Sequence, residues 1–116
     1  MDATSLDSRE QLLGRAIPVR AAVPTQFALR QNQPNPFAAL TTIRFELPVG
    51  AMVRLDVFDP QGCRIRKLAS RYFPGGYHSL AWDHRNDDGR ALGPGVYFYR
   101  IEAGPFHDRK KMVLVP

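Results

Sequence analysis

The chain has 116 residues, with 16 Lys and Arg against 11 Asp and Glu, so its net charge at pH 7 is +5. This length suffices for one domain and is too short for two. No stretch approaches the ~18 consecutive apolar residues that a membrane-spanning helix requires. The polar, acidic opening is not that of a secretory signal peptide, so we expect neither a span nor an export leader. Cys63 is the single cysteine, which excludes an internal disulfide and a cysteine-based metal cluster.

The positive charge comes mostly from arginines, which are spread from Arg9 to Arg109 without a cluster. This scatter argues against a nucleic-acid-binding surface. Residues 1–25 mix charge, alanine and proline, and we interpret them as a poorly ordered linker or leader. Residues 26–116 alternate short apolar and polar runs with Gly, Pro, Asn or Asp between them. That pattern predicts an all-β fold, an immunoglobulin-like antiparallel β-sandwich of about seven strands with an extended N-terminal segment.

The parity of apolar and polar residues locates the strands in chain order. The aromatic run at 96–101 is apolar at both parities, so we expect a central strand that is covered on much of both faces. Strands are predicted near residues 27–30, 42–47, 53–58, 63–69, 77–83, 96–101 and 109–115. The residues predicted to enter the core are Phe37, Ile43, Phe45, Leu47, Val53, Leu55, Val57, Ile65, Trp82, Met112 and Leu114.

The strand predicted over residues 63–69 carries three positive side chains, Arg64, Arg66 and Lys67. Charges on an edge strand discourage pairing with the edge of another sheet, and this is the simpler interpretation. A basic binding face is the alternative.

Residues that could carry out catalysis or bind zinc are few. None of His78, His84 and His107 has a second His or Cys at a spacing that builds a zinc site. We expect His78 to be a packed or hydrogen-bonded structural residue. Ser70 and Ser79 lack a nucleophile elbow and an ordered base and acid. The sequence therefore predicts neither an enzyme nor a cofactor.

The loop after Trp82 is the longest polar segment and contains several oxygen-bearing side chains. Their spacing is not that of an EF-hand, and arginines in the same loop would oppose a cation. We therefore interpret Asn-Asp-Asp-Gly as a tight turn with a positive-φ glycine, and we expect no metal there. The alternative, a calcium site, would use Asp83, Asn86, Asp87 and Asp88.

Several short motifs follow one another between residues 27 and 115. They are Leu29-x-Gln31-Asn32-x-Pro34-Asn35-Pro36-Phe37, Thr42-Ile43 with Leu47-Pro48, Val57-Phe58-Asp59-x-x-Gly62, Gly76-x-His78-x-x-x-Trp82-Asp83, Gly95-Val96-Tyr97-Phe98-Tyr99-Arg100 and Lys111-Met112. In this order they resemble the C-terminal sorting domain of type IX secretion substrates, whose profile overlaps the immunoglobulin-like domain of the flagellar hook-capping protein. The chain departs from the usual pattern of that family at Ala38-Ala39, where Asn-Pro often stands, and at His84, where glycine is frequent.

The resemblance implies a noncatalytic module at the end of a larger secreted bacterial protein. Its partners would be the outer-membrane secretion machinery and the other domains of the parent protein, and its location the cell surface or the extracellular space. The export signal would then lie on the parent protein. The candidates for translocon recognition are Gly95, Tyr97, Lys110 and Lys111, for which the alternative roles are turn, core and solvated charge. The motif residues expected to support the fold are Asn35, Pro36, Phe37, His78, Trp82, Asp83 and Tyr99.

Two other functions remain open for a sandwich of this kind. One is an immunoglobulin-like spacer or assembly domain. The other is a carbohydrate-binding accessory domain, which would need aromatic rings exposed on one face. The candidate rings are Phe58, Tyr72, Phe73 and Phe106.

Overall fold

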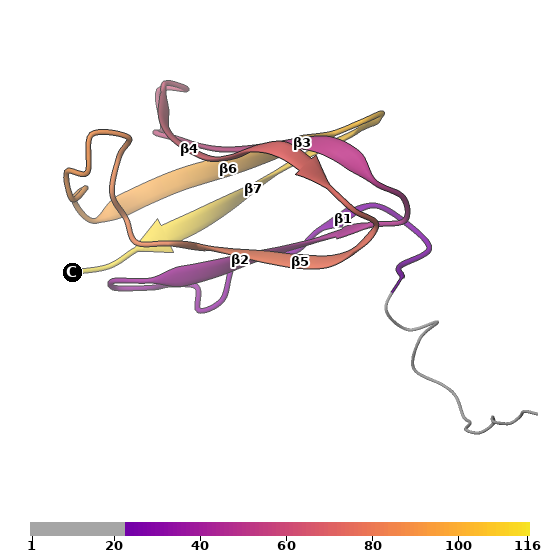
Figure 1. The fold of residues 1–116 in the computed structure, drawn as a ribbon. Helices are drawn as coiled ribbons and strands as arrows, with labels where there is room; N and C mark the ends of the chain where they lie inside the picture. The colour runs from indigo at the N-terminus through magenta and orange to yellow at the C-terminus, as the bar shows by residue number, and fades with distance from the viewer. Residues whose placement is uncertain (1–22) are drawn as a thin grey trace, which may run out of the picture.

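The computed structural model describes residues 23–116, so the linker interpretation of residues 1–25 falls mostly outside the described range. The described part consists of seven β-strands and their connections (Figure 1). None of its segments is a helix that could cross a membrane. The strands are β1 (Ala28–Leu29), β2 (Thr41–Leu47), β3 (Ala51–Phe58), β4 (Arg64–Phe73), β5 (Gly76–Trp82), β6 (Gly95–Ala103) and β7 (Phe106–Leu114).

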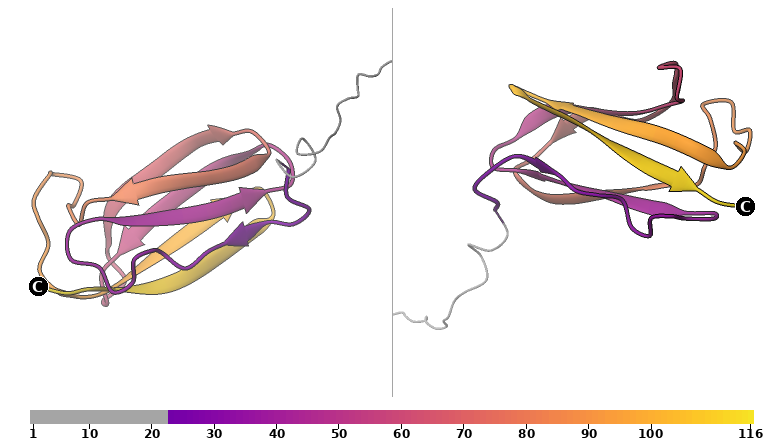
Figure 2. Two further views of the ribbon diagram at one scale, coloured as in Figure 1. Left: turned by 90° about the horizontal axis from the view of Figure 1, so that it is seen from below. Right: turned by 180° about the vertical axis from the view of Figure 1, so that it is seen from behind.

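The strands form two antiparallel sheets that lie face to face (Figures 1 and 2). One sheet has three strands in the order β1-β2-β5, and the other has four in the order β4-β3-β6-β7. Apolar side chains from the two inner faces meet between the layers, where Ile43, Leu55 and Ile101 are fully buried. The predicted β-sandwich is therefore confirmed.

Outside β4, parity predicted the core faces correctly. Every residue predicted to enter the core is buried except Ile65, which is half-buried. The strand of the aromatic run, β6, is central, because it lies between β3 and β7. Its outer face is less covered than we expected, since Val96 is 37% exposed. The three-stranded sheet covers the other face only, where Tyr97 and Tyr99 lie.

Several strands extend beyond their predicted bounds, and β4 and β7 are two of them. β4 continues to Phe73 because its hairpin with β3 stays paired as far as Ala51. β7 begins at Phe106 because the tight turn at 104–105 lets pairing start at Ala103. In both cases a hairpin extends pairing through polar positions that the apolar alternation does not mark.

The positive charges of β4 do not share one face. Arg64 and Lys67 lie on the outer side of the four-stranded sheet and are exposed. Arg66 is paired with Val57, whose side chain faces the core, and it is half-buried. Its Nη1 donates a hydrogen bond to the carbonyl of Asn86 at 3.2 Å. The three residues are therefore not one basic surface.

The edge of β4 is covered by the loop between β5 and β6. The backbone N–H of Asp87 donates to the carbonyl of Ile65 at 2.9 Å. The carboxylate of Asp87 in turn accepts the backbone N–H of Lys67 at 2.9 Å. Charge alone was expected to protect this edge, but part of it is paired with a loop, which occupies donors and acceptors that another strand would use.

Phe37 anchors the segment before β2, and its removal tests that anchor. Its side chain is 2% exposed, and its ring lies 5.9 Å from that of Trp82. Phe37→Ala should lower the free energy of unfolding by about 3–5 kcal/mol, because a large buried ring leaves a cavity. Leu40→Ala is the matched control, since Leu40 belongs to the same segment but is 54% exposed. Urea unfolding measures both, and equal losses for the two variants would contradict the anchor.

Candidate interaction surface at the last strand

β7 forms one edge of the four-stranded sheet, and the segment of residues 30–37, here termed the clasp, runs along it. The N–H of Phe37 donates to the carbonyl of Val113 at 3.0 Å, and the N–H of Val115 donates to the carbonyl of Phe37 at 2.8 Å. Phe37 and Leu114 thereby form a parallel bridge. The clasp therefore acts as a short additional strand at the end of β7.

Two clasp side chains bind further backbone groups of β7. The Oδ1 of Asn35 accepts the N–H of Val113 at 2.9 Å. The Nε2 of Gln31 donates to the carbonyl of Lys111 at 2.7 Å. An unpaired strand edge is a template for pairing with another chain. These bonds close part of that edge from within the chain.

Inside the clasp lies a buried polar group centred on Asn32, which is 1% exposed. Its Nδ2 donates to the Oγ1 of Thr41 at 2.9 Å and to the carbonyl of Pro34 at 3.2 Å. The Thr41 hydroxyl donates to the same carbonyl at 2.9 Å. The Oδ1 of Asn32 accepts the Nε2 of Gln31 at 2.7 Å. These bonds offset the cost of burying an amide, and they fix the clasp against the start of β2.

Tyr99 connects the clasp to the middle of the four-stranded sheet. Its hydroxyl donates to the carbonyl of Arg30 at 2.6 Å, and its side chain is fully buried. Burial raises the pKa of Tyr99 to about 12, although a hydrogen bond from the backbone of Asn32 acts in the opposite direction. The phenol is therefore neutral at ordinary pH and donates the bond that ties both layers together.

The four candidates for translocon recognition do not gather at one point. Gly95 begins β6 and is paired with Leu114. Tyr97 is 9% exposed, and its hydroxyl donates to the carbonyl of Gly93 at 2.6 Å. Burial also raises the pKa of Tyr97 above its ordinary value, with a smaller contribution from Asp59. Tyr97 thus packs inside the sandwich.

Lys110 and Lys111 point to opposite faces of β7, as neighbours on a strand must. Lys110 is paired with Tyr99, a core residue, and is half-buried. Lys111 is paired with Phe98 on the outer face and is exposed. A partner that approaches the outer face therefore meets Lys111 and not Lys110.

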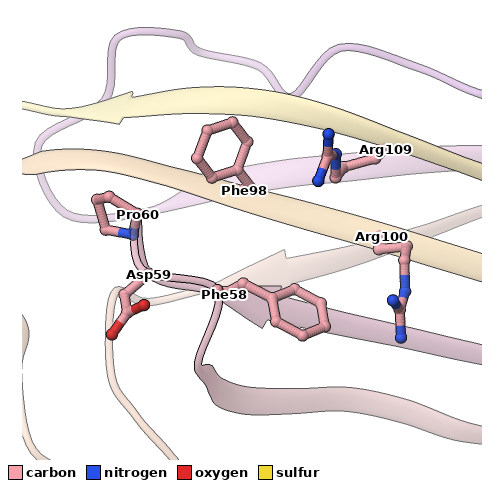
Figure 3. Close-up of a pocket in the computed structure, with 7 residues that line it drawn as sticks. Phe58, Asp59, Pro60, Phe98, Arg100 and Arg109 are labelled. Carbon is pink, nitrogen blue, oxygen red and sulfur yellow. The ribbon is translucent and has the colours of Figure 1, made fainter.

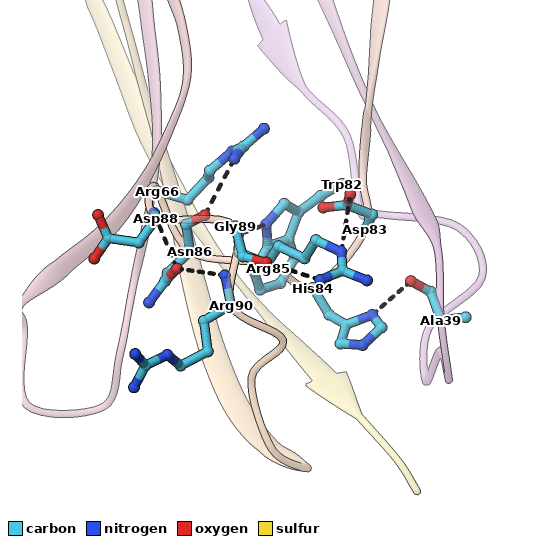
Figure 4. A network of polar contacts seen from close by, with 10 residues as sticks. All are labelled: Ala39, Arg66, Trp82, Asp83, His84, Arg85, Asn86, Asp88, Gly89 and Arg90. Carbon is cyan, nitrogen blue, oxygen red and sulfur yellow. Dashed lines mark hydrogen bonds and ion pairs between the residues drawn. The ribbon is translucent and has the colours of Figure 1, made fainter.

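Hydrogen bonds hold the polar loop after Trp82, both within the loop and to residues outside it (Figure 4). The Oδ1 of Asn86 accepts the N–H of Asp88 and that of Arg90, both at 3.0 Å. Gly89 has a φ of 82°, as the turn interpretation predicts. Among residues 23–116, no group of three or more His, Cys, Asp and Glu side chains gathers as a metal site.

The oxygen-bearing side chains named for calcium have different partners. Asp83 is exposed and its Oδ2 lies 3.7 Å from the Nε of Arg85. Asp87 binds the edge of β4, as described above. The Asn86 oxygen is already held by backbone N–H groups. The loop geometry therefore serves the turn and the sheet edge.

His84 joins this loop to the clasp side of the molecule. It has a φ of 54°, in the left-handed region that glycine adopts without steric cost. Its Nδ1 lies 2.8 Å from the carbonyl oxygen of Ala39 (Figure 4). The bond fixes the loop against the segment before β2.

The remaining motif residues have mainly structural contacts. The Nε1 of the buried Trp82 donates to the carbonyl of Arg85 at 2.9 Å. The Nε2 of His78 lies 2.7 Å from the carbonyl oxygen of Pro74, and its ring packs 5.4 Å from that of Phe45. Pro36 lies exposed in the clasp.

The four rings considered for carbohydrate binding do not share one exposed face. Phe73 is 4% exposed and belongs to the core. Phe106 stacks on Phe27 with a centroid distance of 5.4 Å. Tyr72 and Phe58 lie on the outer face, on different strands, and only Tyr72 is largely exposed. The arrangement does not form the flat aromatic platform that this alternative requires.

Known proteins were compared with the chain at the levels of sequence and structure. No family model matches the sequence, and no curated protein matches it. Among solved structures, the fold is similar to dimeric latent PorU from Porphyromonas gingivalis, with a TM-score of 0.62 and 20% identity over 78% of this chain and 9% of PorU. PorZ, an essential surface component of the type IX secretion system of the same bacterium, has a TM-score of 0.49 and 18% identity over 78% of this chain and 11% of PorZ.

The likeness to PorU shows a shared fold, whereas the likeness to PorZ is too distant to add to it. This chain spans about a tenth of the length of either protein. Neither structure supports the similarity to the flagellar hook-capping protein that the sequence suggested.

The importance of the buried amide in the clasp can be measured directly. Asn32→Ala should lower the free energy of unfolding by about 1–3 kcal/mol, because the Thr41 hydroxyl and the Pro34 carbonyl lose a buried donor. Gln33→Ala, which changes an exposed side chain in the same segment, should stay within about 0.5 kcal/mol. Urea unfolding compares the two variants. A Gln33→Ala loss as large as that of Asn32→Ala would refute the role of the amide.

Tyr99 should make stability depend on alkaline pH. Above its ordinary pKa of 10.0 the unfolded phenol ionises, while the folded phenol keeps its proton up to a pKa of about 12. The unfolded state then binds fewer protons, so stability is complete below pH 10 and falls towards pH 12 by at most about 1.4 kcal/mol per pH unit from this group. Tyr99→Phe should remove that part of the slope. Urea unfolding across this range measures it, and parallel slopes for both proteins would contradict the assignment.

Proposed function

We propose that this chain is a noncatalytic sorting and surface-attachment module of a larger secreted bacterial protein, exported by the type IX secretion machinery. The module would act at the cell surface or outside the cell, after export by a signal on the parent protein. Its partners would be the outer-membrane machinery and the other domains of the parent protein. No cofactor is part of this function.

The ordered motifs of the sequence carry the proposal. In the structure, many of their residues hold the clasp, the end of β7 and the loop after Trp82 in place. Asn35 binds the backbone of β7, and Phe37 fills the core beside Trp82. Residues that serve the fold in this way support a binding module and give no support to a catalytic role.

The shared fold with PorU adds a second support. The match covers most of this chain but only 9% of PorU, so a unit of this size exists there as a small part of a much larger protein. That relation suits a module that is attached to different parent proteins.

The clasp and β7 are the proposed recognition region. Lys111 presents an exposed charge on the outer face, and Lys110 presents a half-buried one on the other side. Gly95 and Tyr97 would act indirectly, by fixing the backbone at the start of β6. Tyr97 is buried, and its hydroxyl donates a hydrogen bond to the carbonyl of Gly93 just before that strand. In this proposal the lysines contact the translocon, and Gly95 and Tyr97 shape the loop beside them.

A sorting assay tests the proposal. The full chain is fused behind a periplasm-targeted reporter in a bacterium that has the type IX machinery. The reporter should reach the cell surface, where added protease removes it, and it should stay in the periplasm of a strain that lacks the translocon. Intact reporter in the periplasm of the parental strain would overturn the sorting function and favour a spacer module.

Charge variants then test the recognition region. Lys110→Gln with Lys111→Gln should reduce surface display, because both proposed contacts are removed. Lys67→Gln is the matched control, an exposed lysine on the opposite edge of the same sheet. Equal display by the lysine pair variant, the control and the wild type would remove these lysines from the proposal while leaving the sorting result intact.

A further inference from the structure

The outer face of the four-stranded sheet carries two arginines that lie directly opposite each other. Arg100 on β6 is paired in register with Arg109 on β7. Side chains at directly opposite positions point to the same face, and like charges there are destabilising. A nearby negative charge would offset this repulsion.

The nearby carboxylates compensate Arg100 better than Arg109. The Oε2 of Glu102 lies 3.6 Å from the Nη2 of Arg100, and Asp56 is its register partner on β3. Asp108, next to Arg109 in the chain, is paired with the core residue Ile101 and so lies on the other face. Within residues 23–116, Arg109 forms no ion pair. Among these residues, the pair therefore keeps one guanidinium group without a carboxylate partner.

Two aromatic rings lie beside these guanidinium groups (Figure 3). The Cζ of Arg100 is 4.9 Å from the centre of the Phe58 ring, and that of Arg109 is 5.6 Å from the centre of the Phe98 ring. Rings and arginines line a shallow pocket of about 260 Å³. Its remaining lining residues are Asp59, Pro60 and Gly62.

Asp59 is the one carboxylate in this lining, and one of its oxygens is held by the turn backbone. Its Oδ1 accepts the backbone N–H groups of Gln61 and Cys63, both at 3.0 Å, in the turn between β3 and β4. Figure 3 shows it at the end of the pocket away from Arg100 and Arg109. The positive end of the pocket is thus separate from its negative end.

We propose that Arg100 and Arg109 together bind a small oxyanion, a carboxylate or a phosphate, whose apolar body lies against Phe58 and Phe98. The planar guanidinium group matches the geometry of both anions with two parallel hydrogen bonds. The anion removes the repulsion between the two arginines, and the rings supply apolar contact. The volume suits one ring or one side chain of a ligand. This site goes beyond the sorting function and does not depend on it.

Binding of small probes to the full chain tests the site by NMR. Benzoate and phenyl phosphate should shift the Nε–H signals of Arg100 and Arg109 and the amide signals of Phe58 and Phe98 in a saturable way. Neutral benzyl alcohol should bind at least about tenfold more weakly, because it lacks the charge-assisted hydrogen bonds. The tighter of the two anions identifies the carboxylate or the phosphate as the preferred group.

Three variants separate binding from stability. Arg109→Gln should weaken both anions about tenfold or more and leave benzyl alcohol unchanged, while its melting temperature stays equal or rises because the repulsion is gone. The anion affinity of Arg109→Lys should lie between those of the wild type and Arg109→Gln, since lysine keeps the charge and loses the planar guanidinium group. Arg44→Gln, an exposed arginine on the other sheet, should behave as wild type. Linear shifts without saturation, or equal anion binding by wild type and Arg109→Gln, would overturn the site.

Discussion

The open edge of β7 is the constraint on which the rest of the sandwich depends. A strand at the edge of a sheet exposes a row of N–H and C=O groups that must be satisfied or protected. The clasp satisfies part of that row with its own backbone at Phe37 and with the side chains of Gln31 and Asn35. Because the clasp leads directly into β2, the same bonds hold the two sheets together. The bond from Tyr99 to Arg30 reinforces this connection from the middle of the core.

The sequence predicted strands and their core residues wherever one face of a strand is buried and the other is exposed to solvent. Parity located the core residues of β2, β3 and β7, because burial on one face leaves a period of two in the sequence. It could not show that Asp56, at an outward position, is 1% exposed, because a period of two does not identify its neighbours across the sheet, Lys67 on β4 and Arg100 on β6. The Arg100–Arg109 pair was not predicted, because the strand near residues 109–115 was located without its register against the aromatic strand. The tight turn at 104–105 sets that register in the structure.

The two departures from the pattern of the resembled family meet in space. His84 stands where glycine is frequent, and the structure shows why glycine suits that position, since its φ is 54°. A residue with a Cβ atom incurs a steric cost of about 1–2 kcal/mol in this region. The hydrogen bond between His84 and the carbonyl of Ala39, the second departure, offsets part of that cost. The sequence does not reveal this contact, because β2 to β5 separate Ala39 from His84 along the chain.

The geometry of β7 also decides how its charges can act. Successive side chains on a strand face opposite ways, so Lys110 and Lys111 cannot form one patch, although they are adjacent in the sequence. Arg109 and Lys111 share the outer face, two positions apart and about 7 Å from one another along the strand. A negatively charged partner that meets the outer face at β7 therefore contacts these two cations. The clasp lies along the edge of β7 and leaves this face open, which places any contact with an anion on side chains and not on the strand backbone.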